Sequence, residues 1–171
     1  MRQLGGLWSF MPFTATLTMV AAASMAGVPL TNGFLSKEMF FTEAVTGTQG
    51  VWAWAVPALV TLAGVFSVAY SLRMVHDTYF NGPLGAVENP HPHEPPLGMK
   101  LPTIGLVVLC VAVGLFPAAT FGPLVHVAAT ALTSQPLPDY HLALWHGFNL
   151  PLLMSVIALV GGILLYRSLA R

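Results

Sequence analysis

One apolar stretch of this chain, residues 10–46, is too long to be a single straight membrane helix. As one helix its apolar part would measure about 50 Å, whereas the hydrocarbon core of a bilayer is about 30 Å thick. Pro29 lies inside the stretch and interrupts helical hydrogen bonding, because proline has no N–H. Gly27 and Gly33 flank it and have little helical preference. The sequence therefore predicts a broken helix over 10–46 that unwinds between Gly27 and Gly33.

Polar residues accompany the predicted break. Unwound backbone cannot face lipid, since each unpaired amide or carbonyl costs several kcal/mol, so such a segment is buried in protein or lines a wet cavity. Ser24, Thr31 and Asn32 are expected to supply side-chain partners there. Lys37 and Glu38 follow directly. An ionisable pair beside a broken membrane helix is typical of an ion or proton path.

The composition is that of an integral membrane protein. Hydrophobic residues make up 56% of the chain and charged residues 7%, and the mean hydropathy is +0.75. The formal net charge is zero, which argues against a nucleic-acid-binding surface. The single cysteine, Cys110, permits no internal disulfide and is expected to be a small core residue. The chain lacks a phosphate-binding glycine loop, a nucleophile elbow and a cysteine cluster, so we expect no enzyme and no cofactor.

The hydrophobic pattern predicts an all-α, polytopic helix bundle of about four spans. We expect one membrane domain over 1–171, and the abrupt start and end suggest a fragment of a longer polypeptide. Two loops separate the later spans: a loop rich in proline and glycine, and a second one with a short half-helix. The predicted segments are the broken helix 10–46, a span 51–75, a cytoplasmic loop 76–100, a span 101–121, an outer loop 122–147 and a span 148–167.

Positive charge predicts the orientation. With four crossings, five basic residues lie on one side of the membrane: Arg2, Arg73, Lys100, Arg167 and Arg171. The opposite loops, 45–50 and 122–147, contain no lysine or arginine. The positive-inside rule therefore places both ends of this chain in the cytoplasm. Lys37 is outside this scheme, and its alternative interpretation is a lysine that extends to the outer surface.

Three segments resemble a known family: RQLGGLWSFMP, AGVPLTNGFLSKEMFFTEA and SVAYSLRMVHDTYF. They resemble the large A-type component of the Mrp-type multisubunit cation/proton antiporters, which is similar to the largest proton-pumping membrane component of respiratory complex I. The pattern G-x-P-x-x-x-G-F-x-S-K-[DE] is specific, and it matches residues 27–38. The resemblance implies the second broken helix of an antiporter fold built from two inverted repeats, followed by three helices. It places the functional lysine on Lys37 and the neighbouring acid on Glu38.

The resemblance also implies a function and partners. It implies a component of a bacterial inner-membrane complex that exchanges Na⁺, or another monovalent cation, for protons and assembles with other membrane subunits. The alternatives are a proton-pumping subunit of NADH-quinone oxidoreductase, or a packing fragment without transport of its own. Small residues suit close contact with such partners; the candidates are Ala63, Gly64, Gly161 and Gly162.

Lysine chemistry suits a proton relay only in a dry site. In water a lysine holds its proton too tightly to release it near neutral pH, and burial disfavours the charged form. The family's fold has a polar axis across the middle of the membrane that joins its two half-channels. Our hypothesis is that Lys37 takes a proton from this axis and passes it outward, with Glu38 tuning the affinity of Lys37 for the proton. The two side chains are adjacent and point about 100° apart on a helix, so they need not pair with each other.

Other ionisable residues give weaker predictions. Glu43 lies about one and a half turns beyond Lys37, and it is either a solvated helix-end carboxylate or part of a cation path. His76 and Asp77 form a polar helix end, with proton uptake as the alternative. The H-P-H-E sequence at 91–94 matches no metal-ligand spacing, so we predict no metal site.

Overall fold

The computed structural model describes residues 5–82, 92–133 and 147–169. Within these ranges the chain forms seven α-helices and no strand, which confirms the all-α prediction. Three helices of the described part are long and apolar enough to cross a membrane. They are α3 (Trp52–Val75) with its continuation η2 (His76–Phe80), α4 (Leu97–Leu115) and α7 (Leu150–Leu169). The shorter helices are η1 (Leu7–Ser9), α1 (Pro12–Ala26), α2 (Asn32–Thr46), α5 (Pro117–Thr120) and α6 (Gly122–Thr133).

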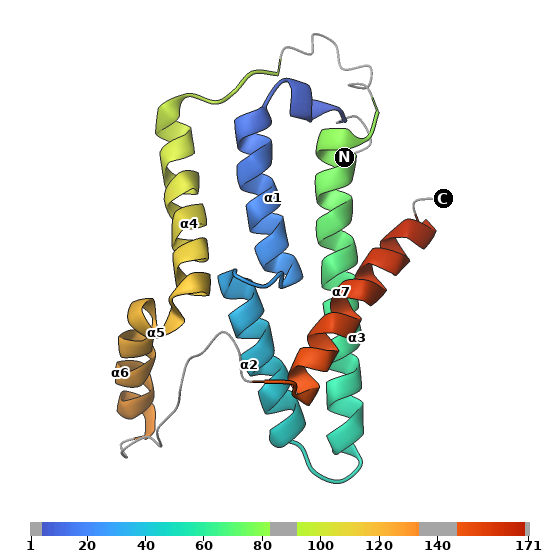
Figure 1. The fold of residues 1–171 in the computed structure, drawn as a ribbon, viewed down its shortest axis with the longest axis vertical. Coiled ribbons are helices and arrows are strands. Elements are labelled where there is room, and N and C mark those ends of the chain that lie inside the picture. The colour runs from blue at the N-terminus through green and yellow to red at the C-terminus, as the bar shows by residue number, and fades with distance from the viewer. Residues whose placement is uncertain (1–4, 83–91, 134–146, 170–171) are drawn as a thin grey trace.

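The stretch predicted to be a broken helix contains α1 and α2, which follow one another along the long axis of the molecule (Figure 1). Residues 27–31 between them are not helical. Asn32 and Gly33, which we expected in the unwound part, instead form the first turn of α2. That α1 and α2 together make a single membrane crossing remains a prediction.

The helix that begins at Trp52 is longer than expected. His76 and Asp77 were predicted to begin a loop, but the helix continues through η2 to Phe80. Tertiary contacts hold this extra turn: the buried Tyr79 packs with residues of η1 and α1, and the Phe80 ring stacks on Trp8 at 5.4 Å. A local sequence pattern does not predict such contacts between distant segments.

The third predicted span is shorter than its range. It was expected over 101–121, but α4 begins at Leu97 and ends at Leu115, and Phe116, with φ of −127° and ψ of 60°, lies outside the helical region and separates α4 from α5. Pro117 explains this end, because proline disfavours the helical region for the residue before it and is well suited to the first position of a new helix.

Small residues let α3 and α7 approach closely, and this is the most extensive helix pair in the described chain. A Cβ on Gly162 would overlap Val68, and a Cβ on Gly64 would lie 3.0 Å from the Ala158 side chain. The small-residue faces were expected to meet other subunits, but Gly64, Gly161 and Gly162 are used inside this chain, where they fix α3 against α7. Ala63 remains exposed.

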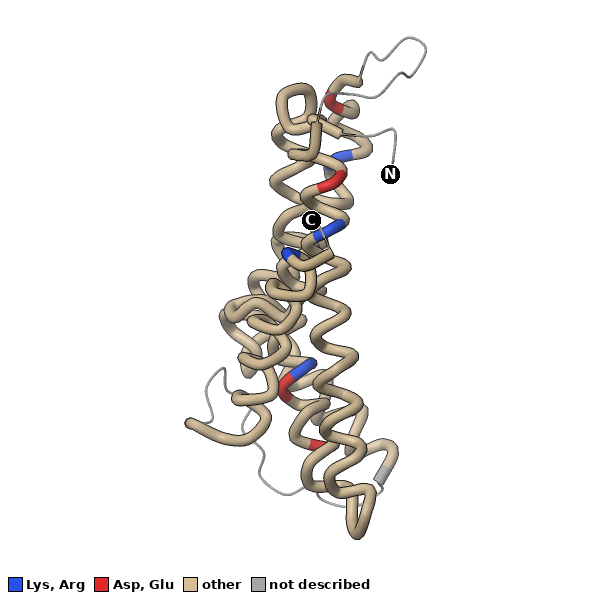
Figure 2. Tube along the Cα trace, turned by 90° about the vertical axis from the view of Figure 1, so that its right-hand side faces the viewer, with Lys and Arg blue, Asp and Glu red and all other residues tan. Residues whose placement is uncertain are grey.

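The remaining surface is strongly apolar. Charged residues are few and mostly lie toward the end of the molecule that holds the start of α1, with a smaller group further along (Figure 2). Large hydrophobic side chains such as Leu62, Leu109 and Leu164 are exposed on the long helices. A surface of this kind requires lipid or other protein around it.

Candidate functional site at the helix break

The end of α1 is closed by a backbone motif. Gly27 takes a left-handed conformation, with φ of 79°. Its N–H donates to the Ser24 carbonyl at 2.9 Å, and the Val28 N–H donates to the Ala23 carbonyl at 2.9 Å. This is the Schellman pattern of helix ends. It leaves the carbonyls of the last two helical residues without backbone partners.

Two side chains from other helices donate hydrogen bonds to these carbonyls. The Lys37 ammonium of α2 donates to the Ala26 carbonyl, with an Nζ–O distance of 2.9 Å. The Ser67 hydroxyl of α3 donates to the Met25 carbonyl at 3.0 Å. Lys37 Nζ also lies 3.4 Å from Ser67 Oγ, a long hydrogen bond. We call Lys37, Ser67 and the carbonyls of Met25 and Ala26 the lysine seat. Because a helix C-terminus carries partial negative charge, the seat favours a cation.

Gly27 is required at the seat for a second reason. A Cβ at this position would lie 2.7 Å from Lys37 Cδ, well inside van der Waals contact. The lysine stem therefore runs directly over the glycine Cα on its way to the end of α1.

The opposite side of the break is tied to α4. Ser24 Oγ donates to the Asn32 side-chain oxygen at 2.7 Å and accepts the Gly33 N–H at 3.2 Å. Cys110 of α4 donates its thiol to the same Asn32 oxygen at 3.0 Å. A Cβ on Gly33 would overlap the Ser24 backbone, so the glycine allows α1 and α2 to meet closely. Half-buried Cys110 is thus a polar partner of the break and not only a filler of the core.

The unwound backbone is strained, and α4 covers one side of it, while Val28, Pro29 and Leu30 are exposed. Leu30 has φ of 74°, a left-handed conformation that costs a non-glycine residue about 1–2 kcal/mol. Pro29, beside it, has no N–H that needs a partner. Thr31 Oγ1 donates to the Val28 carbonyl at 2.7 Å. Gly114 of α4 packs directly on this backbone, where any Cβ would overlap Leu30 and Thr31. Strain of this kind persists only where the surroundings impose it, and it is concentrated at functional sites.

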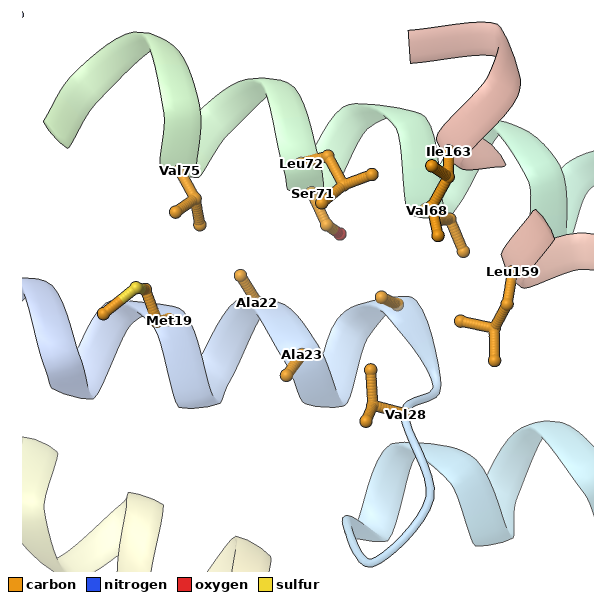
Figure 3. Close-up of a pocket in the computed structure, with 11 residues that line it drawn as sticks. Met19, Ala22, Ala23, Val28, Val68, Ser71, Leu72, Val75, Leu159 and Ile163 are labelled. Atoms are coloured by element: carbon orange, nitrogen blue, oxygen red, sulfur yellow. The ribbon is translucent and has the colours of Figure 1, made fainter. Parts of the chain in front are cut away.

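An apolar cavity of about 270 Å³ adjoins the seat between α1, α3 and α7 (Figure 3). Ala26 lines it, together with Val28 and Val68. The one hydroxyl on its wall, that of Ser71, donates to the Ser67 carbonyl at 2.8 Å. The cavity therefore lies beside Ala26, whose carbonyl belongs to the seat, and its wall is almost entirely apolar.

The two acids of α2 lie in different surroundings. Glu38 is 4% exposed and shares the buried face of the helix with Phe34 and Phe41. Glu43 is exposed in the last turn. The structure therefore places Lys37 and Glu38 in protein surroundings and Glu43 at a surface.

His76 and Asp77 form a separate group. Asp77 forms an ion pair with Arg73 at 3.3 Å, and the His76 Nδ1 lies 3.7 Å from its other oxygen. The His76 ring also meets the edge of Tyr166, with 5.8 Å between centroids. The ten residues that separate Ser67 from Asp77 correspond to about 15 Å of helix, so this group does not join the lysine seat.

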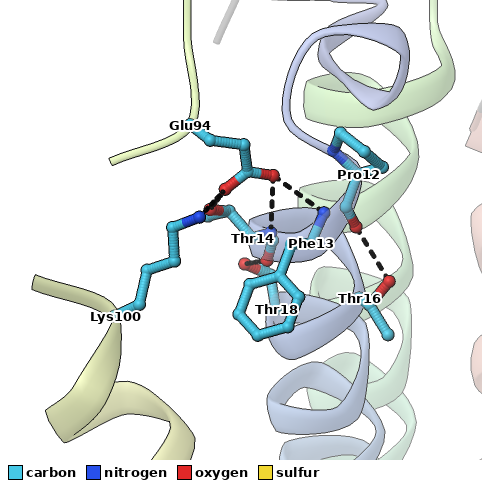
Figure 4. A network of polar contacts seen from close by, with 7 residues as sticks. All are labelled: Pro12, Phe13, Thr14, Thr16, Thr18, Glu94 and Lys100. Atoms are coloured by element: carbon cyan, nitrogen blue, oxygen red, sulfur yellow. Dashed lines mark hydrogen bonds and ion pairs between the residues drawn. The ribbon is translucent and has the colours of Figure 1, made fainter. Parts of the chain in front are cut away.

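A network that the sequence did not predict holds the start of α1 (Figure 4). Glu94 Oε1 accepts the N–H groups of Phe13 at 2.8 Å and Thr14 at 3.2 Å. Its Oε2 accepts the Thr14 hydroxyl at 2.8 Å and pairs with Lys100 at 3.2 Å, and the Lys100 ammonium lies 5.1 Å from the centre of the Phe13 ring. Glu94 therefore caps α1 from a distant part of the chain.

The same contacts set the proton affinity of Glu94. Desolvation alone raises the pKa of this carboxyl group, but the hydrogen bonds from Thr14, Lys100 and Phe13 outweigh it and hold the pKa below its ordinary value. The carboxylate is thus charged at the positive end of α1, where negative charge is favoured.

No group of three metal-ligating side chains occurs in the part of the chain that the structure describes. His91, in the H-P-H-E sequence, lies outside the described residues. Glu94 of the same sequence is directed to the start of α1.

Sequence reasoning missed Ser67 and Glu94. Ser67 belongs to the small-residue run of the second span, which indicated close packing, and its spacing along α3 says nothing of a lysine 30 residues away. Glu94 was considered only as a metal ligand. A helix that begins without a capping side chain of its own was the available signal, since such an end needs a partner from elsewhere.

Comparison with known proteins shows what this chain is similar to. Residues 1–67 match the family described as NADH:quinone oxidoreductase/Mrp antiporter, TM. The chain is 52% identical over 166 residues, or 96% of its length, to the A/B subunit of a probable K⁺/H⁺ antiporter of Rhizobium meliloti (strain 1021), covering 16% of that protein. It is 34% identical over 99% of its length to the A subunit of the Na⁺/H⁺ antiporter of Bacillus subtilis (strain 168), covering 23% of it.

A solved structure gives the same result for the fold. The structure of the Mrp complex from Dietzia sp. DQ12-45-1b contains a chain that matches 98% of this one with a TM-score of 0.80 and 34% identity, and 18% of that chain is covered. These findings confirm the resemblance read from the sequence. This chain spans less than a quarter of the length of these relatives.

Proposed function

We propose, because residues 1–67 match the NADH:quinone oxidoreductase/Mrp antiporter family, that this chain is part of the large A-type component of a multisubunit antiporter. The complex exchanges a monovalent cation, Na⁺, for protons across a bacterial inner membrane. Its partners are other membrane subunits, as the name of the Bacillus relative and the matching Mrp complex suggest. The observation that carries the proposal is the lysine seat, which holds a single cationic side chain at the end of an interrupted helix.

Lys37 is the proton relay in this proposal. A proton reaching the neutral amine from the polar axis forms the ammonium, which the Ala26 carbonyl and the Ser67 hydroxyl stabilise. Release toward the outer side breaks these contacts and returns the amine. Buried Glu38, next in sequence, tunes the affinity of the relay for its proton.

The other ionisable residues have secondary roles. Exposed Glu43 lies about one and a half turns beyond Lys37 and belongs to the outer end of the path. His76 and Asp77 lie at the other end of the same helix bundle, in the ion-paired group with Arg73, and belong to the cytoplasmic side. The break itself contains Gly27, Pro29 and Thr31, and Asn32 and Gly33 begin the helix that follows it.

The experiment that tests this function compares native protein with Lys37→Ala in the full-length polypeptide within its complex. Everted membrane vesicles are energised, and a pH-sensitive dye reports proton movement after addition of Na⁺ or, separately, K⁺. We expect the cation-induced dye recovery to vanish in Lys37→Ala, with the amount of assembled complex unchanged. The matched control is Ser36→Ala, because the neighbouring serine is exposed and bonds only to its own helix.

The outcomes separate the candidate functions. Exchange that persists in Lys37→Ala would contradict the relay. A response to K⁺ alone would change the cation, in line with the name of the 52% identical relative. No response of the native protein to either cation would favour a proton-pumping subunit of an NADH-quinone oxidoreductase, which the family description includes.

A further inference from the structure

The lysine seat contains a residue with no assigned part in exchange, Ser67 of α3. We propose that Ser67 is a positioning residue for the Lys37 relay: its hydroxyl occupies the Met25 carbonyl and thereby directs the Lys37 ammonium to the single acceptor left open, the Ala26 carbonyl. This inference rests on the proposed function, since it assigns Ser67 a role in the same relay.

The hydrogen bonds at the end of α1 support this role. The backbone takes the Ala23 and Ser24 carbonyls. Without Ser67, the carbonyls of both Met25 and Ala26 would be open to the lysine, and the ammonium would have two alternative acceptors. With Ser67 in place, each of the two last carbonyls has one donor, and the positions of the donors are fixed.

The Ser67 hydroxyl oxygen also accepts a hydrogen bond from the lysine. A serine hydroxyl has one donor and two acceptor lone pairs. Because Ser67 donates its hydrogen to Met25 at 3.0 Å, its lone pairs are available to Lys37 Nζ at 3.4 Å. Ser67 thus bridges three helices: it belongs to α3, it bonds the end of α1, and it holds the cation of α2.

The position of Ser67 is itself rigidly determined. Its neighbours on α3 pack closely against α7: a Cβ on Gly162 would overlap Val68, and a Cβ on Gly161 would lie 3.1 Å from the Val65 side chain. A hydroxyl on such a helix is a fixed reference point for the lysine.

The test uses the full-length polypeptide in its complex, with the dye assay and a series of Na⁺ concentrations. We expect Ser67→Ala to lower the maximal exchange rate about tenfold, the effect of losing one hydrogen bond to a charged group. The Na⁺ concentration for half-maximal rate should stay the same, because Ser67 holds the proton carrier and not the cation. Ser67→Thr, which retains the hydroxyl, should restore the rate.

The matched control is Ser71→Ala, one turn along α3. Ser71 is more deeply buried than half-buried Ser67, and its hydroxyl bonds to the Ser67 carbonyl of its own helix. The exchange rate of Ser71→Ala should therefore equal that of the native protein. Equal losses in Ser67→Ala and Ser71→Ala would identify a packing effect and overturn the proposal. If Ser67→Ala fails to assemble, Ser67→Cys, with a weak donor in the same place, should show the same loss of maximal rate.

The two proposals fail separately. A native rate in Ser67→Ala, with Lys37→Ala inactive, overturns the role of Ser67 and leaves the relay intact. A native rate in Lys37→Ala overturns the relay, and the role of Ser67 with it.

Discussion

At the scale of single residues, the break is built by glycines that have different tasks. Gly27 supplies the left-handed turn that ends α1 and leaves room for the lysine stem. Gly33 allows contact between α1 and α2, and Gly114 allows α4 to cover the unwound backbone. The sequence predicts the first of these tasks, because a glycine two residues before a proline is a strong sign of a helix end. The other two depend on which helices become neighbours.

We expect Gly27→Ala to lower both stability and exchange, because Gly27 has a left-handed backbone and lies against the Lys37 side chain. Alanine in the left-handed region costs about 1–2 kcal/mol. Its Cβ would also lie 2.7 Å from Lys37 Cδ, so the lysine side chain would have to move. The thermal unfolding midpoint of the purified complex should fall, and so should the exchange rate. Gly98→Ala is the control, since nothing lies within 4 Å of a Cβ there; an equal loss in both variants would contradict a specific role of Gly27.

At the scale of elements, α1 is held at both ends by charges that belong to other parts of the chain. Glu94 caps its beginning and Lys37 its end, so a negative and a positive group each lie where the helix dipole favours them. The sequence predicts the break and the following lysine, because they are local. It does not predict the partners of the helix ends, because Glu94 lies 80 residues from Thr14.

The Glu94 cap should depend on pH. The pKa of Glu94 in the folded chain lies below its ordinary value. The charged cap therefore stabilises the start of α1 fully at pH values above the ordinary pKa, and this stabilisation is lost as the pH falls through the lowered pKa. Glu94→Gln should give the same loss at neutral pH. Hydrogen exchange of the Phe13 and Thr14 amides, read by mass spectrometry of the complex, measures both effects.

The control for this experiment is Glu43→Gln, an exposed acid at the far end of α2. Its substitution should leave the Phe13 and Thr14 amides as protected as in the native protein. Unchanged protection in Glu94→Gln would show that the neutral hydrogen bonds are sufficient and that the charge adds nothing.

At the scale of the whole molecule, α1 and α2 run one after the other along the long axis and α3 runs back beside them (Figure 1), and most basic groups lie toward the end that holds the start of α1 (Figure 2). The all-α class, the positions of the long spans and the family resemblance follow from hydropathy and motifs. Hydropathy and motifs do not predict that the helix continues through η2, or that Gly161 and Gly162 pack inside this chain. Side-chain packing between distant segments decides both.

The orientation and the single crossing of α1 with α2 are testable together. The test uses a Cys110→Ala background and a membrane-impermeant maleimide. The reagent should label Gln49→Cys only from outside, and it should label Ser9→Cys and a second cytoplasmic probe, Ser168→Cys, only from the cytoplasm. The native side chains at these three positions are exposed. Labelling of Ser9→Cys and Gln49→Cys from the same side would contradict a single crossing.

The anchoring of α1 at both ends makes it a rigid connection between two titratable sites. A helix of 15 residues spans about 22 Å and changes length little, so an axial shift at Glu94 reaches the Ala26 carbonyl nearly undiminished. If Lys37 is the relay proposed above, any coupling between it and Glu94 through α1 has to be reciprocal: a change in the proton occupancy of Glu94 that alters the proton affinity of Lys37 is matched by the same factor in reverse.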